Sequence, residues 1–414
     1  MMILRQTSIV VIGAGNRANK YLEYLVRNPQ TVKLVGVVEP NDLRREKIAD
    51  EFSLQPSSCF TCYEQFFASR IKADAVFICT PDDKHFEPCM RAIEAGYNVL
   101  LEKPIAQSLE ECEQICKAAK RSGVVVGVCH ILRYHPYFQK IKQIVDAGSL
   151  GKIISINHTA EINLDRMTHS YVRGIFSNEC TSSPLLVAKC CHDIDFLLWL
   201  CSSRCKRVSS FGSLSWFKEE NAPQGSAARC VECGVESNCP YSAVSLYRNR
   251  KEWVSNFNVP SGGSIEDIIE QELQSGRYGR CVFRCGNDVA DHQIVNMEME
   301  DGATISIAIN AFTRDDCRRT HIKLTNGEID GDERSLRVRH FRNGEDYVID
   351  YSHLERQPYH AGADLNIVEA FLRAISPCCE EMCSDITDAV ASHIVGFNAE
   401  RSRREGRVVN INWN

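Results

Sequence analysis

The chain has 414 residues, 44% of them hydrophobic and 25% charged, and its net charge is -6. This length exceeds one ordinary hydrophobic core, so we expect two domains. Because the net charge is negative, the chain has no excess of positive charge that would attract nucleic acid or an anionic membrane. No apolar run reaches the roughly 18 residues of a membrane span.

The 21 cysteines favour a reducing compartment. Several, such as Cys79 and Cys129, lie in apolar segments, where a free thiol behaves as a small hydrophobe. Residues Met1 to Ile12 run straight into a glycine turn rather than a small-residue cleavage site, so we interpret them as a strand and not a signal peptide. We expect a cytoplasmic protein without a disulfide framework.

The first element is a β-branched run over residues 8–12, followed at once by a glycine-rich turn. Such a run is typical of a strand buried on both faces of a parallel sheet. Gly13 allows a tight turn, and Gly15 lets the backbone approach a pyrophosphate. The helix that begins around Asn16 and Arg17 offers free N–H groups to phosphates.

A second apolar strand over residues 35–39 ends in Glu39, roughly 20 residues past the turn. A carboxylate there accepts the adenosine ribose hydroxyls, so the two parts together predict a dinucleotide site. Arg44 or Arg45 could reach a 2′-phosphate, but Glu39 would repel that group. We therefore favour NAD over NADP.

Two further strands of this domain end in polar residues. The strand over 73–79 leads to a turn at the carboxyl edge of the sheet, where ligands lie in open α/β sheets, and a helix over 85–96 follows. The strand over 97–101 leads to Glu102 and Lys103. The complete predicted cofactor set is Gly13, Gly15, Asn16, Arg17, Glu39, Thr80, Pro81, Asp82, His85, Glu102 and Lys103. For His85, a solvated residue at a helix start is an equal alternative.

After a strand over 124–128 the regular alternation of strands and helices stops, and we divide the chain there, into domains 1–128 and 129–414. Alternating patterns predict half-buried strands, with hairpin signals at 300–302 and 326–327, and helical spacing recurs near the end of the chain. The strands are expected over 152–158, 293–299, 304–308 and 321–324, and the helices over 365–375 and 386–401. Residues 218–274 form a polar, irregular insertion.

One apolar helix, over residues 182–200, carries a polar stripe. Ser183 suits the N-cap and Pro184 the first helical position. Lys189, His192 and Asp195 recur at spacings of three, which puts them on one face, and a buried charged stripe must meet a partner, water or a ligand. For Asp195 the favoured interpretation is a buried structural pair.

Hydride transfer from an alcohol carbon to nicotinamide needs a group that removes the hydroxyl proton, and Lys or His can do this. Lys103 stands at a strand end beside the expected nicotinamide, and His192 is the second candidate. Lys189 would orient or polarise the substrate oxygen. A purely structural role is the alternative for Lys103 and for His192.

Four motifs together resemble the glucose-fructose oxidoreductase/inositol dehydrogenase/MocA family. They are the turn at 13–17, the Cys-Thr-Pro at 79–81, the Glu-Lys-Pro at 102–104, and His192 with Asp195. The resemblance implies a doubly wound Rossmann domain followed by an α/β domain with a large, mostly antiparallel open sheet. It also implies a homodimer or homotetramer formed through that sheet.

The resemblance implies Lys103 and His192 as the catalytic pair. Many relatives carry Asp four residues before the helix His, whereas this chain has Ala188 there, followed by Lys189. The base therefore stays open between Lys103, Lys189 and His192.

Other polar residues near the domain junction could hold a polyhydroxyl substrate, although each is more simply a surface or packing residue. They are Arg133, His169, Tyr171, Arg173, His292 and His360. Cys230, Cys233 and Cys239 resemble part of a zinc site whose fourth ligand would have to come from elsewhere, for example Cys201 or Cys205. We assign no metal to the active site and leave this cysteine group open.

The sequence thus predicts an NAD-dependent oxidoreductase that transfers a hydride to or from a hydroxyl of a small-molecule sugar, sugar derivative or cyclitol. One alternative is an NAD-dependent glycoside hydrolase that acts by transient oxidation. Another is a non-catalytic NAD-binding regulator, although such a protein would be expected to lack Lys103 and His192.

Overall fold

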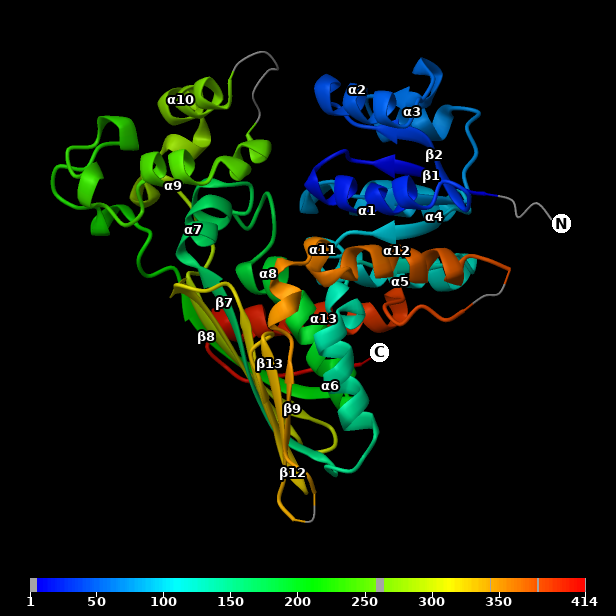
Figure 1. Cartoon of the computed structure of the whole chain (residues 1–414), viewed down its shortest axis with the longest axis vertical. Helices are drawn as coiled ribbons and strands as arrows, with labels where there is room; N and C mark the ends of the chain where they lie inside the picture. Colours follow the sequence, from blue (N-terminus) through cyan, green and yellow to red (C-terminus); the bar gives the residue numbers. More distant parts are fainter. Residues whose placement is uncertain (1–5, 258–263, 343, 378–379, 414) are drawn as a thin grey trace.

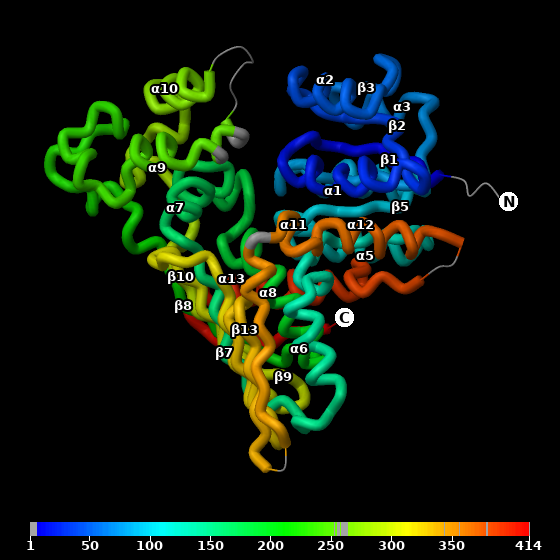
Figure 2. The backbone as a smooth tube through the Cα atoms, viewed as in Figure 1, coloured from blue at the N-terminus to red at the C-terminus, as the bar shows by residue number. Residues whose placement is uncertain are grey.

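The structure, a computed structural model, describes residues 6–257, 264–342, 344–377 and 380–413 (Figure 1). Residues 1–5 of the expected first segment and 258–263 of the expected insertion lie outside the described residues. The molecule consists of two sheets, the helices that pack on them, and a lobe of short helices. The backbone trace shows their arrangement (Figure 2). No described helix is both long and apolar enough to cross a membrane.

The first sheet has six parallel strands in the order β3-β2-β1-β4-β5-β6. Its strands are β1 (Thr7–Ile12), β2 (Val32–Val38), β3 (Cys59–Phe60), β4 (Ala75–Ile78), β5 (Asn98–Leu101) and β6 (Val126–Val128). The order reverses beside β1, and in such sheets the ligand crevice lies at this switch point, outside the carboxyl ends of the strands. The predicted doubly wound domain is confirmed.

Helices cover both faces of this sheet, and two of them come from the far end of the chain. The local helices are α1 (Asn16–Arg27), α2 (Asp42–Glu51), α3 (Tyr63–Ala68), α4 (Phe86–Glu94) and α5 (Leu109–Ser122). From the chain end, α12 (Ala363–Ala374) joins the core on the Ile9 face, and α13 (Ile386–Glu405) begins in the core on the Val10 face. Both helices pack against the first sheet.

The second sheet has nine strands in the order β14-β13-β12-β11-β7-β10-β9-β8-β15, antiparallel except for the pair β7 and β10. Its strands are β7 (Ile153–Asn163), β8 (Cys205–Ser213), β9 (His292–Met299), β10 (Thr304–Thr313), β11 (Arg318–Leu324), β12 (Gly327–Gly331), β13 (Ser335–His340), β14 (Tyr347–Asp350) and β15 (Val409–Asn410). The predicted strands and both hairpins are present, and the strands extend beyond the predicted limits.

One face of the second sheet packs against helices. These are α6 (Pro136–Asp146), α8 (Leu185–Cys201) and the later part of α13, and Ile141, Ile194 and Ile305 share one core. The other face is open. There, Phe211 and Ile294 are directly paired across β8 and β9, with exposed fractions of 64% and 39%.

The expected irregular insertion is instead a helical lobe, defined here as residues 219–284, which lies across from the first sheet in Figure 1. It contains α9 (Ala243–Asn249), α10 (Ile265–Ser275) and the 3-10 turns Glu219–Asn221, Cys230–Glu232, Glu236–Asn238, Lys251–Asn256, Arg277–Gly279 and Val282–Arg284. Ser264 and Asp267 form a capping box at the start of α10. This Ser-x-x-Asp signal was readable in the sequence, so the irregular assignment was wrong.

The segment before α8 contains short helical elements that border the later site. They are Ile131–Tyr134, α7 (Leu164–Arg166) and a π-helical stretch, Met167–Arg173. Helix α8 itself begins one residue later than predicted. Pro184 is the N-cap rather than the first helical residue because its ψ of 145° is extended, and Ser183 Oγ has no hydrogen-bond partner.

Candidate active site

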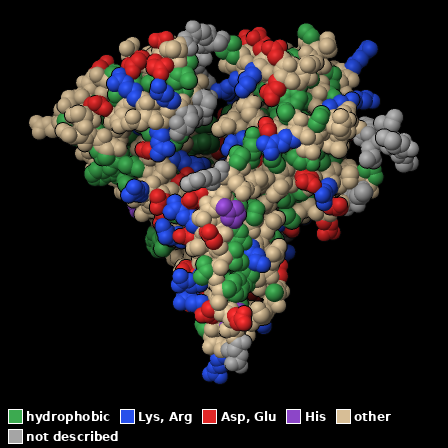
Figure 3. Space-filling model, in the orientation of Figure 1, with side chains coloured by type: hydrophobic (Ala, Val, Ile, Leu, Met, Phe, Trp, Pro, Cys, Tyr) green, Lys and Arg blue, Asp and Glu red, His purple; other side chains and the backbone are tan. Residues whose placement is uncertain are grey.

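A deep cleft lies between the carboxyl edge of the first sheet, α8 and the helical lobe, and its volume is about 2450 Å³. Figure 3 shows the molecule hollowed between these parts. All of the predicted cofactor and catalytic residues line it except His85. Residues predicted from separate segments are therefore brought together in one place.

The turn after β1 has the geometry that a dinucleotide requires. Gly13 has a φ of +89°, and a Cβ there would lie 2.7 Å from the Cys79 carbonyl oxygen, so only glycine fits. A Cβ on Gly15 would meet nothing within 4 Å, which leaves room for a ligand against the backbone. No side chain caps α1, so the amides at Asn16 and Arg17 can donate to a phosphate. This cradle fits a pyrophosphate.

Glu39 stands at the end of β2, buried at the edge of the cleft. Its Oε2 accepts from the Ala14 N–H at 2.7 Å, and its Oε1 accepts from the Asn41 N–H at 3.0 Å. The carboxylate is thus held in one orientation beside the glycine turn.

The side chain of Arg17 is already paired. Its guanidinium donates to Glu102 at 2.6 Å and to Asp364 of α12 at 2.7 Å, so the backbone amide is the part of Arg17 that remains available for phosphate. Burial alone would raise the pKa of Glu102, but the charges of Arg17 and Lys103 outweigh it and lower that pKa. This cluster ties α1, β5 and α12 together below the cleft.

The turn after β4 places Thr80, Pro81 and Asp82 in the cleft wall. Asp82 is buried and accepts from Ser182 Oγ at 3.0 Å, and burial raises its pKa. His85 is buried behind the turn, with its ring nitrogens 2.6 Å from the Pro104 carbonyl oxygen and 2.9 Å from that of Thr80. It is neither solvated nor in the cleft, because these carbonyls hold the ring inside the wall.

Lys103 and His192 share the cleft, although they come from β5 and α8. Lys103 Nζ donates to the Ala188 carbonyl oxygen at 2.8 Å, one turn before His192 on the same helix. His192 makes no hydrogen bond among the described residues, and its Nδ1 is buried. Burial, and then the charge of Lys103, lower the pKa of His192 well below its ordinary value. The imidazole is therefore neutral near pH 7, and it is a weaker base than an exposed histidine.

Lys189 also faces the cleft, with only 8% of its surface exposed. Burial, reinforced by the Arg166 guanidinium and opposed by Asp316, lowers the pKa of Lys189 to about 8. Its Nζ lies 3.5 Å from Asp316 Oδ1. A lysine that titrates near neutral pH can exchange a proton with a bound hydroxyl.

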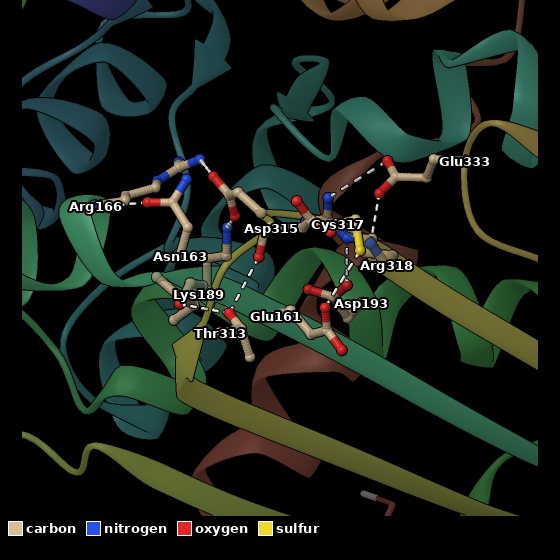
Figure 4. A network of polar contacts seen from close by, with 12 residues as sticks. Glu161, Asn163, Arg166, Lys189, Asp193, Thr313, Asp315, Cys317, Arg318 and Glu333 are labelled. Carbon is tan, nitrogen blue, oxygen red and sulfur yellow. Dashed lines mark hydrogen bonds and ion pairs between the residues drawn. The ribbon is translucent and has the colours of Figure 1, made fainter. Parts of the chain in front are cut away.

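Lys189 belongs to a polar network that sequence reasoning missed (Figure 4). Arg166 pairs with Asp316, and Arg318 pairs with Asp193 and Glu333. Arg166 and Asp316, and likewise Arg318 and Asp193, are more than a hundred residues apart, so local spacing does not connect them. The available signal was Asp193, four residues after Lys189 and on the same helix face.

The predicted stripe of three residues is not continuous. Asp195 faces away from the cleft, accepts two 2.8 Å hydrogen bonds from Arg133 and lies 2.9 Å from His130 Nδ1. Steps of three residues lag behind the 3.6-residue helical turn, so Asp195 has rotated well away from Lys189. Burial alone would raise the pKa of Asp195, but His130 and Arg133 lower it to about 2. Its favoured structural interpretation agrees with these contacts.

Of the six residues considered for substrate contacts, three line the cleft: His169, Tyr171 and His360. The other three are engaged elsewhere. Arg133 binds Asp195, Arg173 donates to backbone carbonyls, and His292 lies against Asp291.

The helical lobe contributes cleft residues that the sequence did not indicate, among them Trp253 and Tyr278. The ring of Tyr278 stacks on His169, with centroids 4.6 Å apart. Burial lowers the pKa of His169 to about 3, so this aromatic wall is uncharged at neutral pH. Aromatic faces opposite charged groups suit a ligand with apolar C–H faces and hydroxyl edges.

A glycine cradle and a carboxylate at the end of the second strand, in one cleft with Lys103, His192 and Lys189, are the features of a Rossmann dinucleotide-binding protein. Residues 7–130 match the oxidoreductase family with an NAD-binding Rossmann fold, and residues 138–255 match the GFO/IDH/MocA C-terminal domain. The chain belongs to the glucose-fructose oxidoreductase/inositol dehydrogenase/MocA family.

Individual relatives agree with this assignment. Oxidoreductase P35 of Formosa agariphila is 32% identical over 271 residues, which cover 64% of this chain and 76% of that protein. The scyllo-inositol 2-dehydrogenase (NAD(+)) of Bacillus subtilis is 30% identical over 194 residues, covering 43% and 56%. The chain spans between about half and three quarters of the length of the curated relatives first matched.

A solved structure shares the fold over the whole chain. Levoglucosan dehydrogenase, in complex with NADH and levoglucosan, superposes with a TM-score of 0.72 at 16% identity and covers 99% of this chain and 100% of its own. This likeness supports the two-sheet architecture.

Proposed function

We propose that this protein is an NAD-dependent dehydrogenase of a sugar, sugar derivative or cyclitol. The observation that carries the proposal is the cleft, which holds the dinucleotide cradle together with Lys103, His192 and Lys189. The names of the inositol and levoglucosan dehydrogenases among the similar proteins support this substrate class.

The cradle residues divide the binding of the cofactor. Gly13, Gly15 and the first amides of α1 would hold the pyrophosphate. Glu39, fixed by two backbone amides, would accept the ribose hydroxyls and repel a 2′-phosphate, which favours NAD over NADP. When bound, the nicotinamide ring supplies the hydride acceptor for oxidation of an alcohol carbon.

The three cleft residues would divide the proton chemistry. Neutral His192 accepts the hydroxyl proton, and the Lys103 ammonium stabilises the negative charge that develops on that oxygen. Lys189 orients a second oxygen of the substrate. Its pKa of about 8 makes it the specific alternative as base, because a base with that pKa gains activity as the pH rises through 8.

The decisive experiment is a screen for NAD reduction over inositols, aldoses, sugar acids and glycosides. We expect net NADH formation with one substrate class, and the loss of most of the rate in Lys103→Ala and His192→Ala with NAD binding retained. Product cleavage without net NADH would instead indicate a hydrolase. Unchanged behaviour of both variants, with no turnover, would indicate a regulator.

The same cleft suggests how the chain is divided. We propose residues 1–128 as the cofactor domain and 129–414 as the substrate domain, with α12 and α13 returning to the first.

The open sheet face with Phe211 and Ile294 supports assembly into a homodimer or homotetramer through that face. Sedimentation velocity of Phe211→Glu would test the assembly. The described cysteines, all unpaired, support a cytoplasmic location.

A further inference from the structure

The helical lobe has a small core for a part of the molecule that shapes the cleft. Among the described residues, that core contains eight buried hydrophobic side chains, including Cys230, Tyr247 and Tyr278. Units this small usually need a disulfide or a structural metal in addition to hydrophobic burial.

Four cysteines line one enclosed pocket at the base of the lobe: Cys230, Cys233, Cys239 and Cys281. The first three come from the turns at 230–232 and 236–238, and Cys281 comes from the segment that leaves the lobe, more than forty residues later. A β-bridge between Arg229 and Arg280 joins the two segments. The space inside is about 10 Å³, close to the size of a single water or ion.

The pocket also contains an uncompensated positive charge. Arg173 is fully buried, and it makes no ion pair with a described residue. Its Nε and Nη2 donate to the carbonyls of Arg280 and Tyr241, and Nη2 lies 3.8 Å from Cys230 Sγ, but Nη1 has no partner. Glu236 also lines the pocket, but its Oε1 accepts from Ser242 Oγ, and no ion pair joins it to Arg173 among the described residues. A buried guanidinium is costly without an anion, so negative charge closer to Arg173 would stabilise the pocket.

We propose that Cys230, Cys233, Cys239 and Cys281 bind a structural Zn²⁺ ion as four thiolates. Such a centre carries a net charge of roughly −2, which would compensate Arg173. Arg284, whose Nη1 lies 3.9 Å from Cys281 Sγ, is already paired with Glu219. The Ala243 N–H donates to Cys230 Sγ at 3.5 Å, as backbone amides do to metal-bound sulfur. The fourth ligand is Cys281, not Cys201 or Cys205, which belong to the core of the second sheet.

Closing the site requires rotation of cysteine side chains. Across the described residues, three potential ligand atoms all within 4.8 Å of one another occur only at His130, Cys191 and His393, so the four sulfurs stand wider apart than in a closed centre. The proposal therefore includes a change of χ1 rotamer, which moves a sulfur while the backbone stays in place. Metal binding would release the thiol protons and lock these rotamers.

Other candidate groups are poorer ligands. Cys285 does not line this pocket, and its Sγ donates to the Cys281 carbonyl oxygen at 3.1 Å, a shorter contact than the 3.9 Å from Cys230 Sγ to the Arg280 carbonyl oxygen. His393 in the buried histidine group has no free lone pair. Its Nε2 accepts from the Ile105 N–H at 2.9 Å, and its Nδ1 faces the Ala389 carbonyl oxygen.

The test measures metal in the full-length protein, purified without chelators from zinc-supplemented growth. We expect about one zinc per chain, and at least a tenfold lower content in Cys230→Ser and in Cys239→Ser. Cys285→Ser is the matched control and should keep its zinc. Cobalt added to the stripped wild-type protein should give the charge-transfer and intense d–d bands of tetrahedral thiolate coordination.

The wild-type measurements decide the matter even if the ligand variants fail to fold. Protein without zinc that also gives no cobalt spectrum would overturn the proposal. So would zinc that survives in Cys230→Ser, or a brown protein with iron and visible absorption. None of these readouts depends on catalytic turnover, so the dehydrogenase proposal stands or fails separately.

Discussion

The buried charge of Lys189 should lower the free energy of unfolding of the protein. Replacing Lys189 with a neutral residue should measure by how much. Its pKa falls from the ordinary 10.5 to about 8 on folding. Since one pKa unit corresponds to 1.36 kcal/mol, Lys189→Met should be more stable than the wild type by about 3 kcal/mol at pH 7. Asp316 keeps its partner Arg166 in the variant, so no unpaired carboxylate is created.

The pH dependence of this stability difference follows from the same pKa shift. Because the folded pKa is the lower one, the unfolded chain binds more protons between pH 8 and 10.5, and wild-type stability rises across this range. The advantage of Lys189→Met should therefore shrink to about 1.4 kcal/mol at pH 9.5.

Urea unfolding of both proteins at pH 7 and 9.5 measures the difference, and other titrations cancel in the comparison. Lys117→Met replaces an exposed lysine of α5 and should show no such pH dependence. A variant that is less stable than the wild type at pH 7, or an advantage equal at both pH values, would refute the reasoning.

Four other predictions test the site and its supports. Lys103→Ala and His192→Ala should each lower kcat by about 10²-fold or more with NAD affinity within a few fold, and a similar loss of NAD binding would misplace both residues. If His192 is the base, the rate should be flat between pH 7 and 9, whereas a rise through pH 8 that disappears in a Lys189 variant would contradict that role. Gly13→Ala should abolish NAD binding measured by calorimetry, because the new Cβ meets a carbonyl of the adjacent turn. Asp195→Asn should lower the free energy of unfolding by about 3 kcal/mol, since it breaks a buried ion pair with Arg133, and an unchanged urea midpoint would count against this.

Much of the first domain was predictable because its signals are local. A buried parallel strand is a continuous apolar run, so the strand at 8–12 stands out from the sequence. Residue 13 must be glycine because its φ is positive and a Cβ there would lie against the Cys79 carbonyl oxygen.

The parts that were missed depend on contacts between distant segments. Arg318 comes from a strand of the second sheet, and its meeting with Asp193 follows from the sheet order and not from any spacing along the chain. The helical lobe was missed for a different reason. Much of its described part consists of 3-10 turns, and α9 spans only seven residues, whereas α10 could have been found from the cap at Ser264 and from the helical spacing of Ile265, Ile268, Ile269 and Leu273.

The return of α12 and α13 to the first sheet has a consequence for how this enzyme can be cut and how it can move. A fragment ending at residue 128 would leave both faces of its sheet bare where Ile367 and Ile386 pack, and we expect it to aggregate. Because α12 and α13 pack on the two faces of the first sheet, they oppose a hinge motion between the two sheets. The helical lobe is anchored as well: Trp253 and Tyr278 face the cleft, while Val282 and Phe283 at the end of the lobe belong to the core of the second sheet.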